Sequence, residues 1–251
     1  MKYLEEKTLS WANAALNEFC VGDRVINGRL ECFSCKKAGQ DKKLAKSLEL
    51  LYQSSSNSND VVEQQQNSTP SSNCATVAAS NNISIGNLAD SNTRKLLINL
   101  ISTMNASFPD YDFSDLKPEQ FHKEVDMRMV VNAINTQLAE IVEMDNVGFL
   151  EKLWESIVAA IAPTDCEVYT YIPDMDGCSD PFSDGTLWSF NYFFYNKELK
   201  KILYFTCMSR SAVHDINGND DDEDDDDDMV CRSEDDDDDD AVMEGDWEDG
   251  A

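Results

Sequence analysis

WSFNYFFYNKELKKILYF, residues 188–205, is the most informative segment of this chain for its fold. It is dense in aromatic, aliphatic and β-branched residues and is interrupted once, at Asn196-Lys197-Glu198, which predicts two strands joined by a short turn. Strand side chains alternate between faces, so Phe190 and Phe194 lie on one face and Phe193 and Tyr195 on the other. Because both faces are apolar, we expect these strands at the centre of a sheet that is covered on both sides.

The elements around this hairpin follow from the spacing of apolar residues. Leu9, Ala12, Leu16 and Phe19 predict an N-terminal helix that ends at Gly22-Asp23. Residues 25–36 alternate as a strand, and residues 42–52 are typical of a short helix.

Further along, residues 96–104 predict a helix with Asp90 or Ser91 as its cap. Pro118 suits the first turn of another helix, whose apolar stripe runs through Phe121, Val125 and Met129 to Ile141. A helix over 147–162 and a strand over 167–172 complete the prediction.

This order of elements indicates an α+β fold with an antiparallel sheet packed by helices, because no regular crossover helices separate the strands. The N-terminal strand must join the C-terminal hairpin, since an isolated strand is not stable. We therefore expect a single domain made of residues 1–52 and 91–214. It is interrupted by a disordered Ser/Asn/Gln-rich linker over 53–90 and followed by a disordered acidic tail over 215–251.

The charge of the chain is concentrated in that tail. Residues 215–251 hold 21 acidic residues and one basic residue, a net charge of −20, whereas the whole chain carries −29. So acidic a protein is a poor candidate for direct, sequence-specific DNA binding, which needs clustered Lys and Arg against phosphates. The lysines at 36, 37, 42, 43 and 46 are compatible either with a nuclear-import signal or with a solvated helix face.

No segment of the sequence resembles a signal peptide or a membrane span, so we expect reduced cysteines and no membrane partner. Cys32 and Cys35 form a lone C-x-x-C without a second Cys or His pair, so no metal site is expected. Asp174 and Asp176 match the D-x-D-G of aspartyl phosphatases, but too little chain follows for the parallel sheet such an enzyme needs. With no phosphate-binding or dinucleotide loop either, we predict neither an enzyme nor a cofactor.

Three blocks carry a family resemblance: INGRLECFSCK at 26–36, PDYDFS at 109–114 and WSFNYFFYNKELKK at 188–201. In sequence and in order they resemble signatures of the eukaryotic Maf-one family, the global repressors of RNA polymerase III transcription. One departure is that Glu198 interrupts Lys197, Lys200 and Lys201, where the family has a more continuous basic run.

The resemblance implies a repressor that binds the clamp region of RNA polymerase III and blocks its assembly with the TFIIIB initiation factor. Protein kinases and a phosphatase are implied as further partners, because phosphorylation excludes members of the family from the nucleus and relieves repression. We therefore expect a phosphoprotein in nutrient signalling that shuttles between nucleus and cytoplasm. Thr69, before Pro70, is a minimal proline-directed site, and Ser233 precedes acidic residues that suit a casein-type kinase.

Two sets of residues are candidates for partner binding: the 109–114 loop, with Asp110, Tyr111 and Asp112, and the basic turn Lys197, Lys200 and Lys201. The loop has two interpretations. Either its carboxylates face a basic partner surface, or they cap helices while Tyr111 and Phe113 anchor the loop to the core. An alternative function for the whole chain is an acidic, histone-chaperone-like scaffold that acts through the polyanionic tail.

Overall fold

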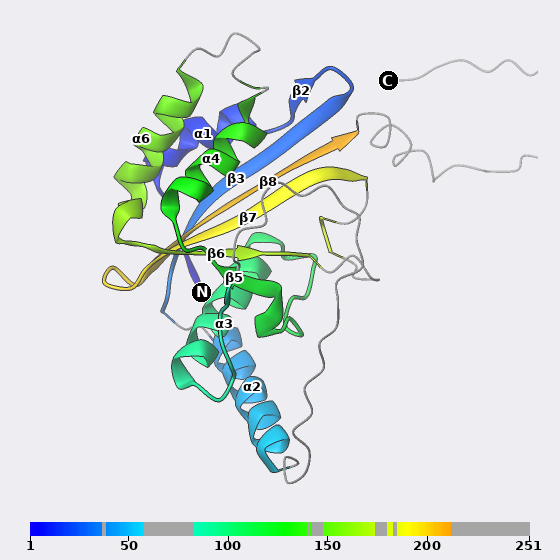
Figure 1. Ribbon diagram of the computed structural model, residues 1–251, viewed down its shortest axis with the longest axis vertical. Helices are drawn as coiled ribbons and strands as arrows, with labels where there is room; N and C mark the ends of the chain where they lie inside the picture. The colour runs from blue at the N-terminus through cyan, green and yellow to red at the C-terminus, as the bar shows by residue number, and fades with distance from the viewer. Residues whose placement is uncertain are drawn as a thin grey trace, which may run out of the picture.

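A single antiparallel sheet organises the molecule (Figure 1). The computed structural model describes residues 1–36, 39–57, 83–139, 141, 148–173, 180–182 and 185–211. Within these residues the sheet has eight strands in the order β1-β3-β8-β7-β6-β5-β4, and β2 also pairs with β3. The strands are β1 Lys2–Leu4, β2 Phe19–Val21, β3 Arg24–Ser34, β4 Ile83–Ser84, β5 Phe121–Lys123, β6 Glu167–Tyr171, β7 Thr186–Asn196 and β8 Lys201–Ser211.

Helices cover both faces of this sheet, and each face has its own hydrophobic core. The helices α1, α4 and α6 pack on one face, whereas α2 and α3 pack on the other (Figure 1). Their bounds are α1 Ser10–Leu16, α2 Gly39–Asn57, α3 Ser91–Ser107, α4 Met127–Gln137 and α6 Phe149–Ile161, with short 3-10 turns η1 Lys7–Leu9, η2 Pro118–Gln120 and η3 Pro163–Asp165.

The predicted central hairpin is confirmed as β7 and β8. Phe194 and Phe205 pack in the core under α1, α4 and α6, and Phe193 and Tyr204 pack in the core under α2 and α3. All four side chains are fully buried, and the rings of Phe193 and Tyr204 stack with centroids 4.5 Å apart. The alternation read from the sequence therefore sorts the side chains correctly between the two faces.

The N-terminal strand joins this hairpin, as predicted. β3 pairs with β8 along its whole length, from Arg24 opposite Ser211 to Ser34 opposite Lys201. Residues 167 to 187 positions apart in sequence are therefore neighbours in the sheet, which makes one domain of the two ends of the folded chain. The predicted cap of α3 is also correct, since the side chain of Asp90 accepts a hydrogen bond from the Asn92 N–H at 3.1 Å.

The helix predicted to start at Pro118 is wrong in its first part. Pro118 begins only the short turn η2, and Phe121 lies in β5, where it pairs with Tyr171 of β6. α4 starts at Met127 because Asp126 caps it, its carboxylate accepting a hydrogen bond from the Arg128 N–H at 2.9 Å. A strand of three residues has no periodicity of its own, so only its pairing with β6 determines it.

The N-terminal helix is shorter than predicted. α1 ends at Leu16, and Phe19 already belongs to β2. Gly22 and Asp23 do not end a helix but form the turn between β2 and β3, with Gly22 at a positive φ of 60°. Only the helical part of that apolar stripe, from Leu9 to Leu16, is correct.

Ordered structure extends into both ends of the predicted linker, because α2 continues to Asn57 and β4 begins at Ile83. Residues 58–82 and 212–251 lie outside the described residues, so the disorder expected for the linker and the acidic tail stays a prediction. Within the described residues, no helix is both long and apolar enough to cross a membrane.

Candidate functional site

The 109–114 loop leaves the C-terminal end of α3, which stops at Ser107. Pro109 cannot continue a helix because it lacks a backbone N–H. The chain turns tightly instead, as the Phe108 N–H donates to the Met104 carbonyl at 2.8 Å and the Tyr111 N–H to the Phe108 carbonyl at 3.1 Å. The end of a well-packed helix thus fixes the position of the loop.

Aromatic side chains hold this loop against the sheet. Phe113 is buried, and its N–H donates to the Asn105 side-chain oxygen at 2.8 Å. The ring of Phe108 lies 6.1 Å from that of Phe113 and 6.5 Å from that of Tyr111, in edge-on geometries that aromatic pairs prefer. The guanidinium of Arg29 on β3 lies over the ring of Phe108, 4.7 Å from its centroid.

Both carboxylates of the loop are exposed, but only one is used within it. Asp112 accepts a hydrogen bond from the Ser114 N–H at 2.9 Å. Hydrogen bonds from the side chain and the backbone of Ser114 lower the pKa of Asp112 below its ordinary value, so it stays ionised. Asp110 is exposed at the tip. Phe113 therefore anchors the loop, as the second interpretation predicted, but Asp112 binds within a turn and does not cap a helix. That the two carboxylates face a basic partner stays a prediction.

A second loop, which the sequence analysis did not select, reaches the same place. Phe182 is buried, and its ring packs edge-on to Phe108 with centroids 5.3 Å apart. The Asp180 carboxylate accepts hydrogen bonds from the Phe182 N–H at 2.9 Å and the Tyr171 hydroxyl at 3.3 Å. A phenylalanine inside a polar, Asp-rich stretch was the sequence signal for this anchor.

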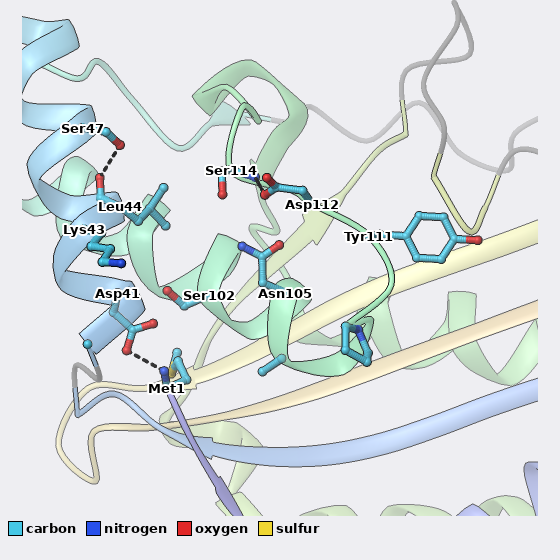
Figure 2. Close-up of a pocket in the computed structure, with 13 residues that line it drawn as sticks. Met1, Asp41, Lys43, Leu44, Ser47, Ser102, Asn105, Tyr111, Asp112 and Ser114 are labelled. Atoms are coloured by element: carbon cyan, nitrogen blue, oxygen red, sulfur yellow. Dashed lines mark hydrogen bonds and ion pairs between the residues drawn. The ribbon is translucent and has the colours of Figure 1, made fainter.

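A half-open groove of about 840 Å³ separates the loop from the start of α2 (Figure 2). Asp41 and Lys43 on α2 face Ser102 and Asn105 on α3, and Asp112 and Ser114 form the far rim. The groove is also lined by Met1, Gly39, Leu44, Ser47, Ala106, Pro109 and Tyr111.

Two kinds of contact hold α2 beside this groove. Leu44 and Leu48 are buried in the core on this face of the sheet. At the start of the helix, the amino group of Met1 donates to the Asp41 carboxylate at 2.5 Å, and both groups are almost completely buried. A carboxylate in the first turn of a helix also interacts favourably with the helix dipole. The groove wall is therefore a fixed part of the fold.

The basic turn lies elsewhere and is largely neutralised by carboxylates. The Lys197 ammonium contacts Glu167 at 2.6 Å. Lys201, with a side chain only 12% exposed, pairs with Glu6 and also donates to the Ala160 carbonyl at 2.8 Å. Lys200 is exposed at a positive φ of 51° in the turn. Lys197 and Lys200 are therefore the exposed lysines of this turn, whereas Lys201 acts within the fold.

Glu167 is the centre of this ion-pair network. Its carboxylate also accepts hydrogen bonds from Lys123 at 2.8 Å and from the Tyr169 hydroxyl at 2.7 Å. Burial alone would raise the pKa of Glu167, but the hydrogen bonds from Lys123, Lys197 and Tyr169 outweigh it and lower this pKa to about 2. The network joins β5, β6 and the β7–β8 turn.

The structure does not bring the two candidate sets into one site. Phe108, which precedes the loop, lies over Arg29, and Arg29 pairs with Thr206 of β8. Lys201 is five residues away from Thr206 along the same strand, or about 17 Å at the usual rise per residue. The phosphorylation candidates Thr69 and Ser233 lie outside the described residues.

The other motifs that suggested a catalytic or metal site in the sequence do not come together as such a site among the described residues. Cys32 packs in the core under α1, whereas Cys35 packs against the opposite core, since residues three apart on an extended chain point to opposite faces. Burial raises the pKa of Cys32 to about 12 and that of Cys35 to about 11, so both remain thiols. No group of three His, Cys, Asp or Glu suited to a metal occurs in the described part of the chain.

The phosphatase interpretation also fails on topology. Asp174 and Asp176 lie outside the described residues, but the strands on either side of them, β6 and β7, pair antiparallel. An aspartyl-phosphatase loop requires a parallel sheet at that point. His122 lies on β5, not on a helix, and burial lowers its pKa.

Comparison with known proteins matches this chain to one family. Residues 26–206 match the family model described as Maf1 regulator. Over 246 residues the chain is 37% identical to "Repressor of RNA polymerase III transcription" of Dictyostelium discoideum, covering 86% of this chain and 87% of that protein. It is 35% identical over 215 residues to "Repressor of RNA polymerase III transcription maf1" of Schizosaccharomyces pombe, covering 81% of each.

A solved structure agrees with this assignment. The fold resembles the crystal structure of citrus MAF1 with a TM-score of 0.58 and 29% identity, over 82% of this chain and 99% of that one. The matched residues 26–206 contain the hairpin stretch 188–205, the 109–114 loop and most residues of both hydrophobic cores. This chain belongs to the Maf1 regulator family.

Proposed function

We propose that this protein represses RNA polymerase III transcription by binding the polymerase and preventing its assembly with the TFIIIB initiation factor. The observation that carries the proposal is the match to relatives named as repressors of RNA polymerase III transcription, over more than four-fifths of both chains. We further propose that phosphorylation at sites such as Thr69 and Ser233 relieves this repression, and that the protein moves between nucleus and cytoplasm.

The 109–114 loop is the surface we assign to the polymerase. Asp110 and Asp112 are exposed on an aromatic-anchored loop, so little conformational entropy is lost when a partner binds. Two carboxylates at one tip favour a partner surface rich in Lys and Arg. On the basic turn, Lys197 and Lys200 supply a smaller surface for an acidic partner group.

Promoter-dependent transcription by purified RNA polymerases III and II tests the proposal, with the full chain and with a chain lacking residues 215–251. We expect loss of polymerase III initiation only, retained without the tail, because the loop and the basic turn both lie in the folded part. Equal inhibition of both polymerases that disappears with the tail would instead support the acidic scaffold, whose basis is the −20 charge of the tail.

A further inference from the structure

The groove between α2 and the 109–114 loop contains side-chain donors that lack acceptors. Ser102 on α3 is 6% exposed, and its hydroxyl has no hydrogen-bond partner among the described residues. Asn105 accepts from the Phe113 N–H through its side-chain oxygen, so its amide nitrogen is left for another group. Both side chains line the groove, and their donor groups point toward α2 (Figure 2). A buried hydroxyl without a partner costs free energy, which a ligand that supplies an acceptor recovers.

The α2 wall adds positive charge at the same place. Lys43 lines the groove and is exposed, and no ion pair joins it to another described residue. Asp41 lies on the same wall, but the Met1 amino group already neutralises its carboxylate. An ammonium, a hydroxyl and an amide N–H around one space form a donor set for the oxygens of an anion.

The far rim of the groove offers an acceptor instead of donors. The Asp112 carboxylate accepts a hydrogen bond from the Ser114 N–H, but an ionised carboxylate has room for further hydrogen bonds. Leu44, Ala106 and Pro109 add apolar contacts to the lining. The groove volume of about 840 Å³ lies in the range of pockets that hold small molecules. A matching ligand therefore has an anionic group at one end and hydroxyl or amino donors at the other.

We propose that this groove binds a small, soluble phosphate monoester, such as a sugar phosphate. The three terminal oxygens of the phosphate accept from Lys43, Ser102 and Asn105, and the hydroxyl groups of the ligand donate to Asp112. The whole chain carries a charge of −29, so binding depends on these local contacts and not on a general attraction for anions. This inference goes beyond the proposed function and does not rest on it.

Titration of the full chain, labelled with nitrogen-15, tests the site with ribose 5-phosphate, inorganic phosphate and ribose as probes. We expect ribose 5-phosphate to shift the side-chain amide signal of Asn105 in the nuclear magnetic resonance spectrum. It should bind about tenfold more tightly than inorganic phosphate, the gain from one charge-assisted hydrogen bond. Ribose alone should cause no shift. No shift with either phosphate compound would overturn the proposal, and equal affinities of the two would show a general anion site and not the proposed one.

Two serines on α3 provide a matched pair of variants. Ser102 and Ser107 are both buried with unpartnered hydroxyls, but only Ser102 lines the groove. We expect Ser102→Ala to weaken the binding of ribose 5-phosphate severalfold without lowering the melting temperature, because removing an unpartnered hydroxyl leaves no group unsatisfied. Ser107→Ala should leave the affinity unchanged. Equal losses of affinity in both variants, or none in Ser102→Ala, would contradict the assignment.

Charge variants test the two ends of the ligand separately. Lys43→Gln should weaken both phosphate compounds about tenfold, whereas Lys95→Gln, exposed on α3 outside the groove lining, should weaken neither. Asp112→Ala should bring the affinity for ribose 5-phosphate close to that for inorganic phosphate and leave the latter no weaker. If Asp112→Ala weakened both compounds alike, Asp112 would not be the group that receives the sugar hydroxyls, and the proposed class of ligand would be wrong.

Discussion

The side-chain amide of Asn13 on α1 pairs with the backbone of Leu30 as a neighbouring strand would: it donates to the Leu30 carbonyl at 3.0 Å and accepts from the Leu30 N–H at 2.8 Å. On this edge of β3, β1 pairs only with residues 32–34 and β2 only with residues 24–26. Asn13 therefore fills the gap between two short strands and protects an edge that other chains could otherwise pair with.

We expect Asn13→Ala to lower the free energy of unfolding by about 2 kcal/mol, since it removes two hydrogen bonds from backbone groups at a buried residue. Urea unfolding followed by circular dichroism measures this. Asn17→Ala, at an exposed position just after α1, is the matched control and should change stability by less than about 0.5 kcal/mol. Equal effects of the two substitutions would show that the pairing with Leu30 contributes nothing.

Gly28 on β3 is required for the close approach of α1. A Cβ atom at this position would lie 3.1 Å from both the Leu16 Cβ and the Cys207 Sγ, closer than ordinary van der Waals contact. We expect Gly28→Ala to destabilise the protein by about 1–3 kcal/mol, because a packed core does not accept an added methyl group. Gly39→Ala is the control, since an added Cβ there meets nothing within 4 Å. Thermal unfolding of both variants tests this prediction, and an unchanged melting temperature for Gly28→Ala would contradict it.

Glu167 should make stability depend on pH in the acidic range. Its pKa in the folded protein is about 2, below the ordinary 4.5, so the unfolded chain takes up the proton first as the pH falls. The stabilisation is complete above about pH 4.5 and is lost as the pH falls towards 2. We expect the unfolding free energy to fall less between pH 6 and pH 3 in Glu167→Gln than in the unsubstituted protein. Glu155→Gln, exposed on α6, should leave the slope unchanged.

The charge of the 109–114 loop can be removed without removing its hydrogen bonds. Asp112→Asn keeps an oxygen that accepts from the Ser114 N–H, whereas Asp112→Ala loses both charge and acceptor. We expect Asp110→Asn and Asp112→Asn to raise severalfold the concentration needed for half-maximal repression of RNA polymerase III, at an unchanged melting temperature. Asp112→Ala should also lose about 1 kcal/mol of stability. Asp165→Asn, an exposed carboxylate in η3, is the control. Repression unaffected by either Asn substitution would exclude the loop as the polymerase surface.

Features with a strong local period could be predicted from the sequence. The alternation in β7 and β8 assigned Phe193 and Phe194 to opposite faces, and both are buried in the expected cores. The cap of α3 at Asp90 was predictable because capping depends on residues within one turn. The strand β5 was not, because three residues starting at Phe121 have no pattern and exist as a strand only through β6.

The candidate site likewise has features that could be predicted from the sequence and features that could not. PDYDFS stands out in the sequence, and Phe113 anchors it to the core as one interpretation predicted, whereas partner binding by its carboxylates stays a prediction. Neither the groove beside it nor the engagement of Lys201 by Glu6, 195 positions away, was predictable. The sequence around a lysine in a turn does not show whether it forms an ion pair, because its partner comes from another part of the chain.

The α+β class, the central hairpin, most of the helices and the family could be predicted from the sequence, since each depends on the period of the side chains or on short motifs in order. Three other features became visible only in the folded protein: the gap that Asn13 fills, the short strands β1, β2, β4 and β5, and the contact between Phe108 and Phe182. Those features join segments that are distant in sequence, and their stability comes from burial and pairing that exist only once the sheet has assembled.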